Sequence, residues 1–588
     1  MAGRITSGLD RIYRKNIELN WFHVGGKWRR PFEAFSWILD RPHQGASNGT
    51  HKKQWWTLGE EPNSACFYLA SHLYTKWKHT SRIVNFFPAQ LDELRRLLVE
   101  ETPKLVVIST TLYTHHHPLV EVVQFIRAHN PDVKIAIGGW YVTQMVSVVE
   151  QPRLSEVLSL LGGDFYIDDY QGETALGHLL EAIKRGNGAS GISNVLYRAG
   201  DQFVCDKREI EDNDMDDCAP DWSLFSREEL GPTVRMRTAR SCAYKCSFCN
   251  FPIIGNLALS RVETVEREMK QLAALGVKQI VFADDTFNIP LRRFEDMLRM
   301  MIDNDFGFEW EAFIRCGNIR REDTFDLMKD SGCAGAFLGF ESGDPSILKN
   351  MNKAVPVERL ASGALELHKR DIPFLASMIA GFPGETWETI DTTVAFLNHI
   401  EPTYFKISPF YYDHRAPVAQ RASEFDLRGA GFNWSHATFD SQMSVDAVDY
   451  VRSNVRNSCW MPSDYYTFFA LPYLRGKGLS NGQILRLTQA LGTCVDVNRL
   501  ANSTSLEARS ARAKALSTLE ATVRALPWED ARFALVEDSP LDAPSFRAVV
   551  DRVNADISGV LARATENVRT PEMPVENLGV ASWAPMPT

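Results

Sequence analysis

The stretch SCAYKCSFCN (241–250) decides the assignment of this chain, because it carries three cysteines with the spacing C-x3-C-x2-C. Cys242, Cys246 and Cys249 lie on one predicted loop directly after an apolar strand, so their thiolates can hold three corners of a metal centre. A zinc site normally needs four Cys or His ligands, and the next cysteine is Cys316. Three ligands leave one iron of a cubane cluster open, as a substrate-binding cluster requires. The alternatives are a zinc knuckle that lacks one ligand, or a chance grouping.

The sequence around this loop predicts a parallel barrel. Apolar strands alternate with helical segments such as VETVEREMKQLAALG, and six βα repeats predict a barrel or partial barrel over 231–425, with its chemistry at the carboxyl ends of the strands. The predicted strands are VRMRTA (234–239), QIVFADD (279–285), FEWEAFI (308–314), GAFLGFE (335–341), FLASMIAG (374–381) and YFKISPF (404–410).

A second α/β pattern precedes the barrel. Strands and helices alternate between residues 62 and 186, which predicts a doubly wound, Rossmann-like parallel sheet in a domain over 1–190 with an irregular N-terminal extension. Such sheets bind ligands beyond the carboxyl ends of their strands. We interpret 191–230 as a solvated acidic linker and 426–588 as a mostly helical domain with a loose tail. The expected strands are RIVNFF (82–87), KLVVIS (104–109), VKIAIGG (133–139) and DFYI (164–167).

Composition excludes several classes of protein. The chain has 588 residues, and 64 basic against 74 acidic residues give a net charge of −10, which argues against nucleic acid or anionic membranes as partners. Ten cysteines are too dilute for a disulfide scaffold. No run approaches the length of a membrane-spanning helix, and the first residues lack the apolar segment of a signal peptide. We therefore expect a cytoplasmic protein, monomeric, with reduced thiols.

The cysteine spacing, with Phe248 before the third cysteine, resembles that of the radical S-adenosylmethionine (SAM) enzymes. Four later stretches resemble the barrel of the same superfamily: ADDTFN (283–288), RCGNI (315–319), GFESGDPSILKNMNK (339–353) and GFPGETWETI (381–390). The resemblance implies that the three cysteines bind a 4Fe-4S cluster, whose fourth iron SAM chelates through its amino and carboxylate groups. It implies further contacts to SAM from Phe248, Asp284, Asp285, Arg315, Glu341 and Ser342, although barrel salt bridges are the competing explanation for the polar residues.

The front domain lacks G-x-G-x-x-G, which argues against a dinucleotide, and resembles the cobalamin-binding domain found before many such barrels. The stretches that carry the resemblance are VVISTT (106–111), AIGGWYVT (136–143) and DDYQGETAL (168–176). The resemblance implies that small residues at the strand ends let the corrin lie close to the backbone. The implied contacts are Ser109, Thr110, Thr111, Gly138, Gly139, Gly172 and Glu173.

No D-x-H-x-x-G string supplies a histidine for cobalt, and His43 lies one residue off that spacing, so we expect cobalamin without a histidine ligand from this chain. Three successive histidines, His115 to His117, cannot all face one ion, and we interpret them as a solvated loop. Trp55 or Trp56 could cover the lower face of cobalt, with core packing as the equal alternative.

The resemblance implies a cobalamin-dependent radical SAM methyltransferase, in which one SAM methylates cobalamin and a second yields the radical that activates a substrate carbon. We expect a small natural-product or amino-acid-derived substrate, and flavodoxin or ferredoxin as electron donor. The alternative is a non-methylating rearrangement or cyclisation. Methylthiolation would need a second N-terminal cluster, and only Cys66 precedes residue 205. An aromatic set is expected either to cap the barrel mouth or to pack in a helical core: Trp460, Tyr465, Tyr466, Phe468 and Phe469.

Overall fold

A computed structural model describes residue 19 and residues 21–40, 51–113, 115–250, 255–462, 468–498, 503–528, 533–536 and 539–565. The chain divides into two compact units. The first comprises Met1–Gly49, Lys53–Glu61 and Phe225–Phe533, and the second comprises Thr50–Lys52, Pro62–Leu224 and Ala534–Thr588. Strands β3 (His51–Gln54) and β20 (Phe533–Val536) stand where the chain passes from one unit to the other. His43, Tyr465 and Tyr466 lie outside the described residues.

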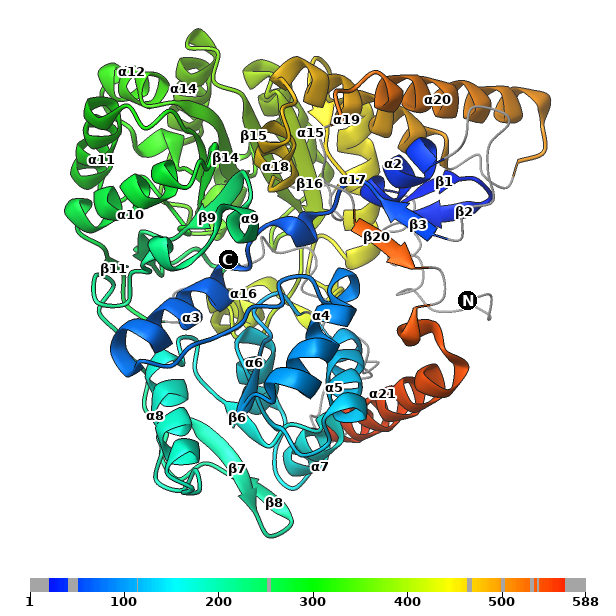
Figure 1. Cartoon of the computed structure of the whole chain (residues 1–588). Helices are drawn as coiled ribbons and strands as arrows, with labels where there is room; N and C mark the ends of the chain where they lie inside the picture. Colours follow the sequence, from blue (N-terminus) through cyan, green and yellow to red (C-terminus); the bar gives the residue numbers. More distant parts are fainter. Residues whose placement is uncertain are drawn as a thin grey trace. The chain divides into compact units, whose positions relative to one another are not determined.

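The first unit is built on a seven-stranded parallel sheet in the order β19-β16-β15-β14-β13-β12-β9 (Figure 1). All six predicted barrel strands are present, as β9 (Thr233–Met236), β12 (Gln279–Phe282), β13 (Glu309–Phe313), β14 (Cys333–Glu341), β15 (Phe374–Ala380) and β16 (Tyr404–Pro409). The seventh strand, β19 (Cys459–Trp460), pairs with β16. Trp460 therefore extends the edge of the barrel sheet and belongs to no helical cap, which corrects the interpretation of this residue.

Helices cover the outer face of this sheet, as the green segments of Figure 1 show. They form because apolar residues recur at helical spacing between the strands; Phe294 of α11, for example, packs against Trp310 of β13 with ring centroids 6.5 Å apart. The helices of the barrel are α10 (Val262–Ala274), α11 (Leu291–Asn304), α12 (Glu322–Asp330), α13 (Pro345–Asn350), α14 (Val357–Lys369), α15 (Trp387–Ile400) and α17 (Ser441–Asn454).

The segment that contains α18 (Ala470–Gly476) fills the barrel lumen toward the amino ends of the strands, where Thr233 of β9 donates to Pro472 O. Its Arg475 forms an ion pair with buried Glu311 of β13, and Phe468 packs against Phe313 with ring centroids 5.2 Å apart. Phe469 lies under the guanidinium of Arg235 from β9, 4.2 Å from ring centroid to Cζ. Phe468 and Phe469 thus form part of a plug inside the barrel, which is neither the cap at its mouth nor the helical core considered for these rings.

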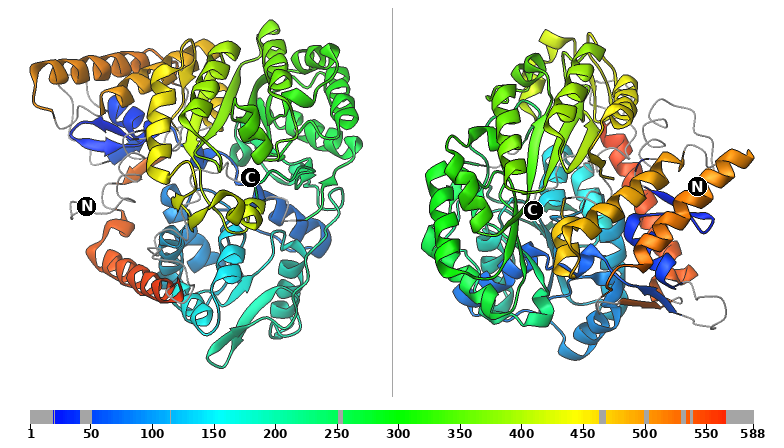
Figure 2. Two further views of the ribbon diagram at one scale, coloured as in Figure 1. Left: turned by 180° about the vertical axis from the view of Figure 1, so that it is seen from behind. Right: turned by 90° about the horizontal axis from the view of Figure 1, so that it is seen from above.

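Further elements of the first unit come from both ends of its sequence. The N-terminal part supplies a hairpin and a helix whose rings pack on α18, where Phe32 and Tyr473 have ring centroids 5.7 Å apart. In both views of Figure 2 the long α20 runs beside α19. These elements are β1 (Phe22–Val24), β2 (Lys27–Arg29), α2 (Pro31–Asp40), α9 (Arg227–Leu230), β10 (Ala239–Arg240), β11 (Ala258–Leu259), α16 (Ala422–Phe425), β17 (Arg428–Ala430), β18 (Asn433–Ser435), α19 (Asn481–Asp496) and α20 (Leu506–Arg524).

The second unit contains a five-stranded sheet in the order β4-β5-β6-β7-β8. Its first three strands are parallel and match three of the predicted ones: β4 (Leu105–Ser109), β5 (Lys134–Gly138) and β6 (Phe165–Ile167). Strands β7 (Val195–Ala199) and β8 (Gln202–Val204) add an antiparallel hairpin. Residues 81–86 form no strand, so the prediction at 82–87 was wrong.

Helices lie on both faces of this sheet, as the doubly wound prediction requires. Ile135 and Ile137 of β5 face a core formed with α5, α6, α7 and α21, whereas Ala136 faces a core formed with α3 and α8. The alternation follows from the two-residue period of a strand. The helices are α3 (Ser64–Trp77), α4 (Leu91–Arg96), α5 (His117–His129), α6 (Trp140–Val148), α7 (Arg153–Leu161), α8 (Glu173–Lys184) and α21 (Pro544–Thr565).

Two segments differ from the expected organisation. Helix α21, expected in a C-terminal domain, packs on α5 and α7 of the second unit (Figure 1). The acidic run around 206–213, expected as a solvated linker, is hydrogen-bonded to the second unit: Glu211 accepts from the N atoms of Thr174 (3.0 Å) and Ala175 (2.8 Å) in the first turn of α8. A carboxylate is favourable there because the first N–H groups of a helix lack internal partners. Charge composition alone could not distinguish this cap from a solvated run.

None of the helices in the described part of the chain combines the length and apolar character that crossing a membrane requires.

Candidate active site

Asp284 fastens the backbone that leads into the cysteine loop. Its carboxylate accepts hydrogen bonds from Thr238 N (2.6 Å), Thr238 Oγ1 (2.5 Å) and Ala239 N (2.9 Å), and the side chain is buried. Burial raises the pKa of Asp284, and these bonds oppose the shift. Asp284 is therefore committed to the chain before the loop, in contrast to its expected contact with SAM.

The far end of the loop is held by segments that follow two later strands. Ser247 N donates to Met351 O (2.8 Å), and Ser247 O accepts from Val418 N (2.8 Å). Asn250 Nδ2 donates to Asp413 Oδ2 (2.7 Å). The cysteine loop is thus fixed above the carboxyl ends of the barrel strands by residues after β14 and β16.

The three cysteines of the loop differ in exposure. None forms a disulfide, and Cys246 is buried, whereas Cys242 and Cys249 are partly exposed. Arg315 Nη1 lies 3.6 Å from Cys246 Sγ, and Cys242 Sγ lies 3.5 Å from Thr286 Oγ1. Among the described residues no group of three or more His, Cys, Asp or Glu side chains is already arranged around one metal ion. The donor set nevertheless fits an iron–sulfur cluster, because three thiols share one short loop.

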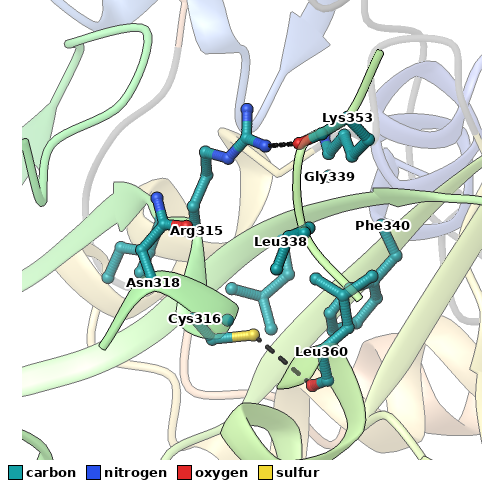
Figure 3. Close-up of a pocket in the computed structure, with 11 residues that line it drawn as sticks. Arg315, Cys316, Asn318, Leu338, Gly339, Phe340, Lys353 and Leu360 are labelled. Atoms are coloured by element: carbon teal, nitrogen blue, oxygen red, sulfur yellow. Dashed lines mark hydrogen bonds between the residues drawn. The ribbon is translucent and has the colours of Figure 1, made fainter. Parts of the chain in front are cut away.

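Arg315, at the end of β13, connects the loop to the barrel. Its guanidinium lies over the ring of Tyr244, with 3.7 Å from Cζ to the centroid, and donates to the carbonyl of Lys353. Lys353 in turn forms a buried ion pair with Glu341, Nζ to Oε1 3.0 Å, and its ammonium lies 5.8 Å from the centre of the Phe248 ring. Figure 3 shows Arg315 and Lys353 above a small pocket whose wall includes Cys316, Leu338 and Leu360.

Asp285 differs from its neighbour Asp284. Its side chain is partly exposed at the end of β12, and its carboxylate makes no hydrogen bond or ion pair with the part of the chain that the structure describes. Burial, and secondarily the charge of Asp284, raise the pKa of Asp285 to about 7, while Arg237 opposes the shift. An unpartnered carboxylate beside the cysteine loop can accept a hydrogen bond from a ligand ammonium group.

Both aspartates follow the end of β12 at Phe282, and they differ in their surroundings: the carboxylate of Asp284 accepts hydrogen bonds from Thr238 and Ala239, whereas that of Asp285 accepts none from the described residues. The structure thus brings Cys246, Phe248, Arg315 and Glu341 into one connected group, with Asp285 open nearby. Ser342 lies outside that group, because its Oγ is 3.3 Å from Thr393 Oγ1 and accepts from Asp344 N.

Sequence reasoning missed Tyr244 and Lys353 as members of the site. Both stand inside the quoted motifs SCAYKC and KNMNK, so the signal was present, but only the fold shows that Arg315 connects them.

In the second unit, the expected contact residues lie at the carboxyl edge of β4 and β5, where they bond mainly to one another. Ser109 Oγ lies 3.0 Å from Thr111 Oγ1, and Thr110 Oγ1 donates to Gly138 O (2.7 Å). Gly139 has φ +104°, and a Cβ there would meet Thr111 N at 3.0 Å. The close approach of the two loops therefore already requires glycine at 139.

The loop after β6 behaves similarly. A Cβ on Gly172, with φ +78°, would meet Ile167 Cγ2 at 3.0 Å, and buried Glu173 accepts from Asn213 Nδ2 (3.2 Å). A Cβ on Gly138 would likewise lie 3.1 Å from Ile167 Cβ. Ser109 and Thr111 keep partly exposed side chains at this edge, whereas Thr110 and Glu173 are buried.

The histidine run is solvated in part: His115 and His117 are exposed, whereas His116 is not. His116 is buried against α21, with Nε2 3.4 Å from both Asn554 O and Ser558 Oγ. Burial, together with neighbouring His117, lowers the pKa of His116 to about 4. Trp56, one of two tryptophans considered for cobalt, is buried in the first unit with its ring centroid 4.0 Å from that of Trp528, so core packing accounts for it.

The fold and the site define an α/β enzyme with a parallel barrel and a loop of three cysteines above the carboxyl ends of its strands. The sequence profile of the radical SAM superfamily matches residues 236–397, which contain this loop and most of the barrel. Residues 236–397 therefore match a radical SAM domain, and that part of the sequence-based resemblance is confirmed.

Known proteins resemble the chain beyond the barrel. An uncharacterised methyltransferase of Pyrococcus horikoshii is 24% identical over 350 residues, which cover 57% of this chain and 73% of the relative. The anaerobic magnesium-protoporphyrin IX monomethyl ester cyclase of Rubrivivax gelatinosus is 23% identical over 424 residues, or 68% of this chain and 74% of the relative. The structure of TsrM from Kitasatospora setae, a radical SAM methyltransferase with cobalamin and a [4Fe-4S] cluster bound, covers 79% of this chain and 96% of TsrM with a TM-score of 0.55. At 16% identity that likeness concerns the fold.

Proposed function

We propose that this chain is a cobalamin-dependent radical SAM methyltransferase that transfers a methyl group to a carbon of a small natural-product or amino-acid-derived molecule. The observation that carries the proposal is the group formed by the cysteine loop, Arg315, Lys353 and Glu341 above a parallel barrel. A front unit with the expected parallel sheet supports the cobalamin part. The fold of a radical SAM methyltransferase with both cofactors bound covers most of the chain.

In this proposal Cys242, Cys246 and Cys249 hold a 4Fe-4S cluster, whose chemistry with SAM is the one-electron cleavage that yields a carbon-activating radical, while cobalamin supplies methyl transfer. The protein's own residues bind and orient. Asp285 presents an open carboxylate for the methionyl ammonium. Because its pKa is about 7, a nearby positive charge can decide whether this carboxylate is ionised at neutral pH. An ammonium beside it would lower that pKa and hold the carboxylate ionised.

Arg315 and the Glu341–Lys353 ion pair lie beneath the cysteine loop and support it. Arg315 is held by the Tyr244 ring and the Lys353 carbonyl, so its guanidinium stays next to Cys246. Glu341 is buried together with Lys353, with which it forms an ion pair. Such fixed charges in a place shielded from water act more strongly than they would in solvent.

In the second unit we assign Ser109, Thr111 and the loops of Gly139 and Gly172 to the cobalamin site, since ligands of such sheets bind at this edge. Trp140 and Tyr170 stand at the same edge, with ring centroids 5.2 Å apart and both partly exposed, and offer aromatic surface to a macrocycle. We propose cobalamin without a histidine of this chain on cobalt; the contact of buried His116 with α21 supports this for that residue.

The radical reaction consumes an electron, so we further propose a flavodoxin or ferredoxin as partner and a reducing, cytoplasmic setting in which the cysteines remain thiols.

The test is anaerobic reconstitution with iron, sulfide and hydroxocobalamin, followed by metal analysis and electron paramagnetic resonance. Four irons per chain and a base-off cob(II)alamin signal without nitrogen coupling are expected. A nitrogen-coupled signal would contradict the proposed cobalt environment, and an iron content that survives replacement of all three cysteines by alanine would contradict the cluster assignment.

A second candidate is a non-methylating cyclisation, favoured by one observation: a relative named as a cyclase matches 68% of this chain. Incubation with SAM labelled in its methyl group separates the two functions. Label in the product supports the methyltransferase, whereas a product without label supports the cyclisation.

A further inference from the structure

A lysine lies inside the barrel, on the inner face of β16. Lys406 is aligned with Ser377 of β15 and, through it, with Gly339 of β14. A Cβ on Gly339 would meet Glu341 Oε1 at 2.3 Å and Lys353 Nζ at 3.4 Å, so this row of residues faces the lumen that contains the Glu341–Lys353 pair. Lys406 therefore lies at the level of Gly339, two residues before Glu341 at the carboxyl end of β14. Its strand, β16, lies toward the end of the sheet opposite to β9.

The lumen is open at this level and closed below it. Along β15 the outward-facing residues are buried by helices, whereas Ser377 and Ile379 on the inner face keep partial exposure. Below this level the lumen is filled by Phe468, whose ring centroid lies 5.2 Å from that of Phe337. A molecule bound under the cysteine loop therefore meets Lys406 before it reaches the plug.

Lys406 has no charged partner of its own. The side chain is buried, and within the described residues it makes no hydrogen bond or ion pair. Burial lowers the pKa of Lys406 to about 8, against the influence of Glu341, which is already paired with Lys353. A buried ammonium without a counter-ion is costly, and a bound anion removes that cost.

A second observation on the same strand face points to a ligand. Ser408, two residues beyond Lys406, is buried and its Oγ has no hydrogen-bond partner among the described residues. Buried hydroxyls nearly always have a partner. Two orphaned polar groups on one inner strand face, one cationic and one a neutral donor, suit a carboxylate, which accepts from both.

We infer that Lys406 and Ser408 form a subsite for a carboxylate on the substrate, so the methyl acceptor belongs to the carboxylic acids. This inference rests on the proposed function. The carboxylate of SAM is the other source of such a group, but in this superfamily it chelates the cluster iron, above the strand ends, and Lys406 lies deeper on a distant strand.

The test uses the reconstituted enzyme and a matched pair of probes, 3-phenylpropionate and its neutral amide, with affinities measured by calorimetry. The carboxylate should bind roughly 10-fold or more tightly than the amide, as expected for a charge-assisted hydrogen bond. Lys406→Met should abolish this preference, whereas the control Lys270→Met, at an exposed lysine paired with Glu266 on α10, should retain it. Affinity for S-adenosylhomocysteine should remain unchanged in Lys406→Met.

Equal binding of the two probes to wild type, or a preference that survives Lys406→Met, would overturn the inference. A selective loss of S-adenosylhomocysteine affinity would overturn it as well, because the carboxylate would then be that of SAM. If Lys406→Met fails to fold, Ser408→Ala serves instead; its hydroxyl bonds to none of the described residues, and a several-fold loss of preference is expected. Failure of the proposed function is distinct: wild type would then hold no cluster, or its product would carry no label from the methyl group of SAM.

Discussion

Replacement of Asp284 should damage the cysteine loop before it affects any ligand. Asp284→Ala removes the acceptor for Thr238 N, Thr238 Oγ1 and Ala239 N, all of them buried. Hydrogen bonds to a charged group contribute roughly 1.5–3 kcal/mol each, and abandoned donors keep their desolvation cost. Since the three share one carboxylate and burial penalises its charge, we expect a loss of about 3–5 kcal/mol from the barrel unit.

The assay compares the protein without cofactors and after reconstitution. Asp284→Ala should lower the thermal unfolding midpoint of the cofactor-free protein by roughly 5–10 °C and reduce the iron bound per chain. Asp284→Asn keeps one acceptor oxygen, so its unfolding midpoint and its iron content should lie between those of Asp284→Ala and wild type. Normal stability and normal iron content, with only SAM affinity lost, would refute this reasoning and return Asp284 to the cofactor site.

The neighbouring residue is the matched control. Asp285→Asn should keep the iron content and lose affinity for S-adenosylhomocysteine, because its carboxylate is open to a ligand. The folded-state pKa of Asp285 is raised to about 7 from 3.8, so the wild-type native state loses stability as pH rises from about 4 to 7. Asp285→Asn should lack that decline and unfold at a higher temperature than wild type at pH 8. An unchanged affinity would remove Asp285 from the proposed site.

Three further predictions concern other parts of the molecule. Cys246→Ala should abolish the cluster absorption of the reconstituted enzyme and leave far-ultraviolet circular dichroism unchanged; retained absorption would contradict its role as a ligand. Arg315→Met should reduce cluster occupancy and accelerate cluster loss in air, whereas Arg320→Met, on an exposed loop nearby, should match wild type. His116 has its pKa lowered from 6.5 to about 4, so acidification from pH 6.5 to 4 should destabilise the native state by up to about 3 kcal/mol. His116→Gln should flatten that decline in pH-dependent denaturation, and an identical decline would show that the imidazole is not buried.

Local patterns predicted most of the barrel because mainly apolar strands alternate with helices of ordinary length. The six expected strands are all present, and the sheet of the second unit shows the expected layers. The predictions were wrong where a segment packs against residues that are distant in the sequence. The plug of Phe468 and Phe469, the edge strand β19 and the docking of α21 all depend on contacts that no local periodicity records.

Residue roles divide along the same line. Local spacing alone identified the cysteine loop and its resemblance to the radical SAM enzymes, because three thiols at fixed short spacing form a donor set on one loop. Asp284 and Asp285 could not be told apart in this way, since they are adjacent residues of equal chemistry after β12. The fold shows that the Asp284 carboxylate accepts hydrogen bonds from the chain before the loop, that the Asp285 carboxylate accepts none from the described residues, and that Lys406 is buried without an ion pair among them. The partners of buried charged groups come from distant parts of the chain, so only the folded structure shows which of these groups are paired.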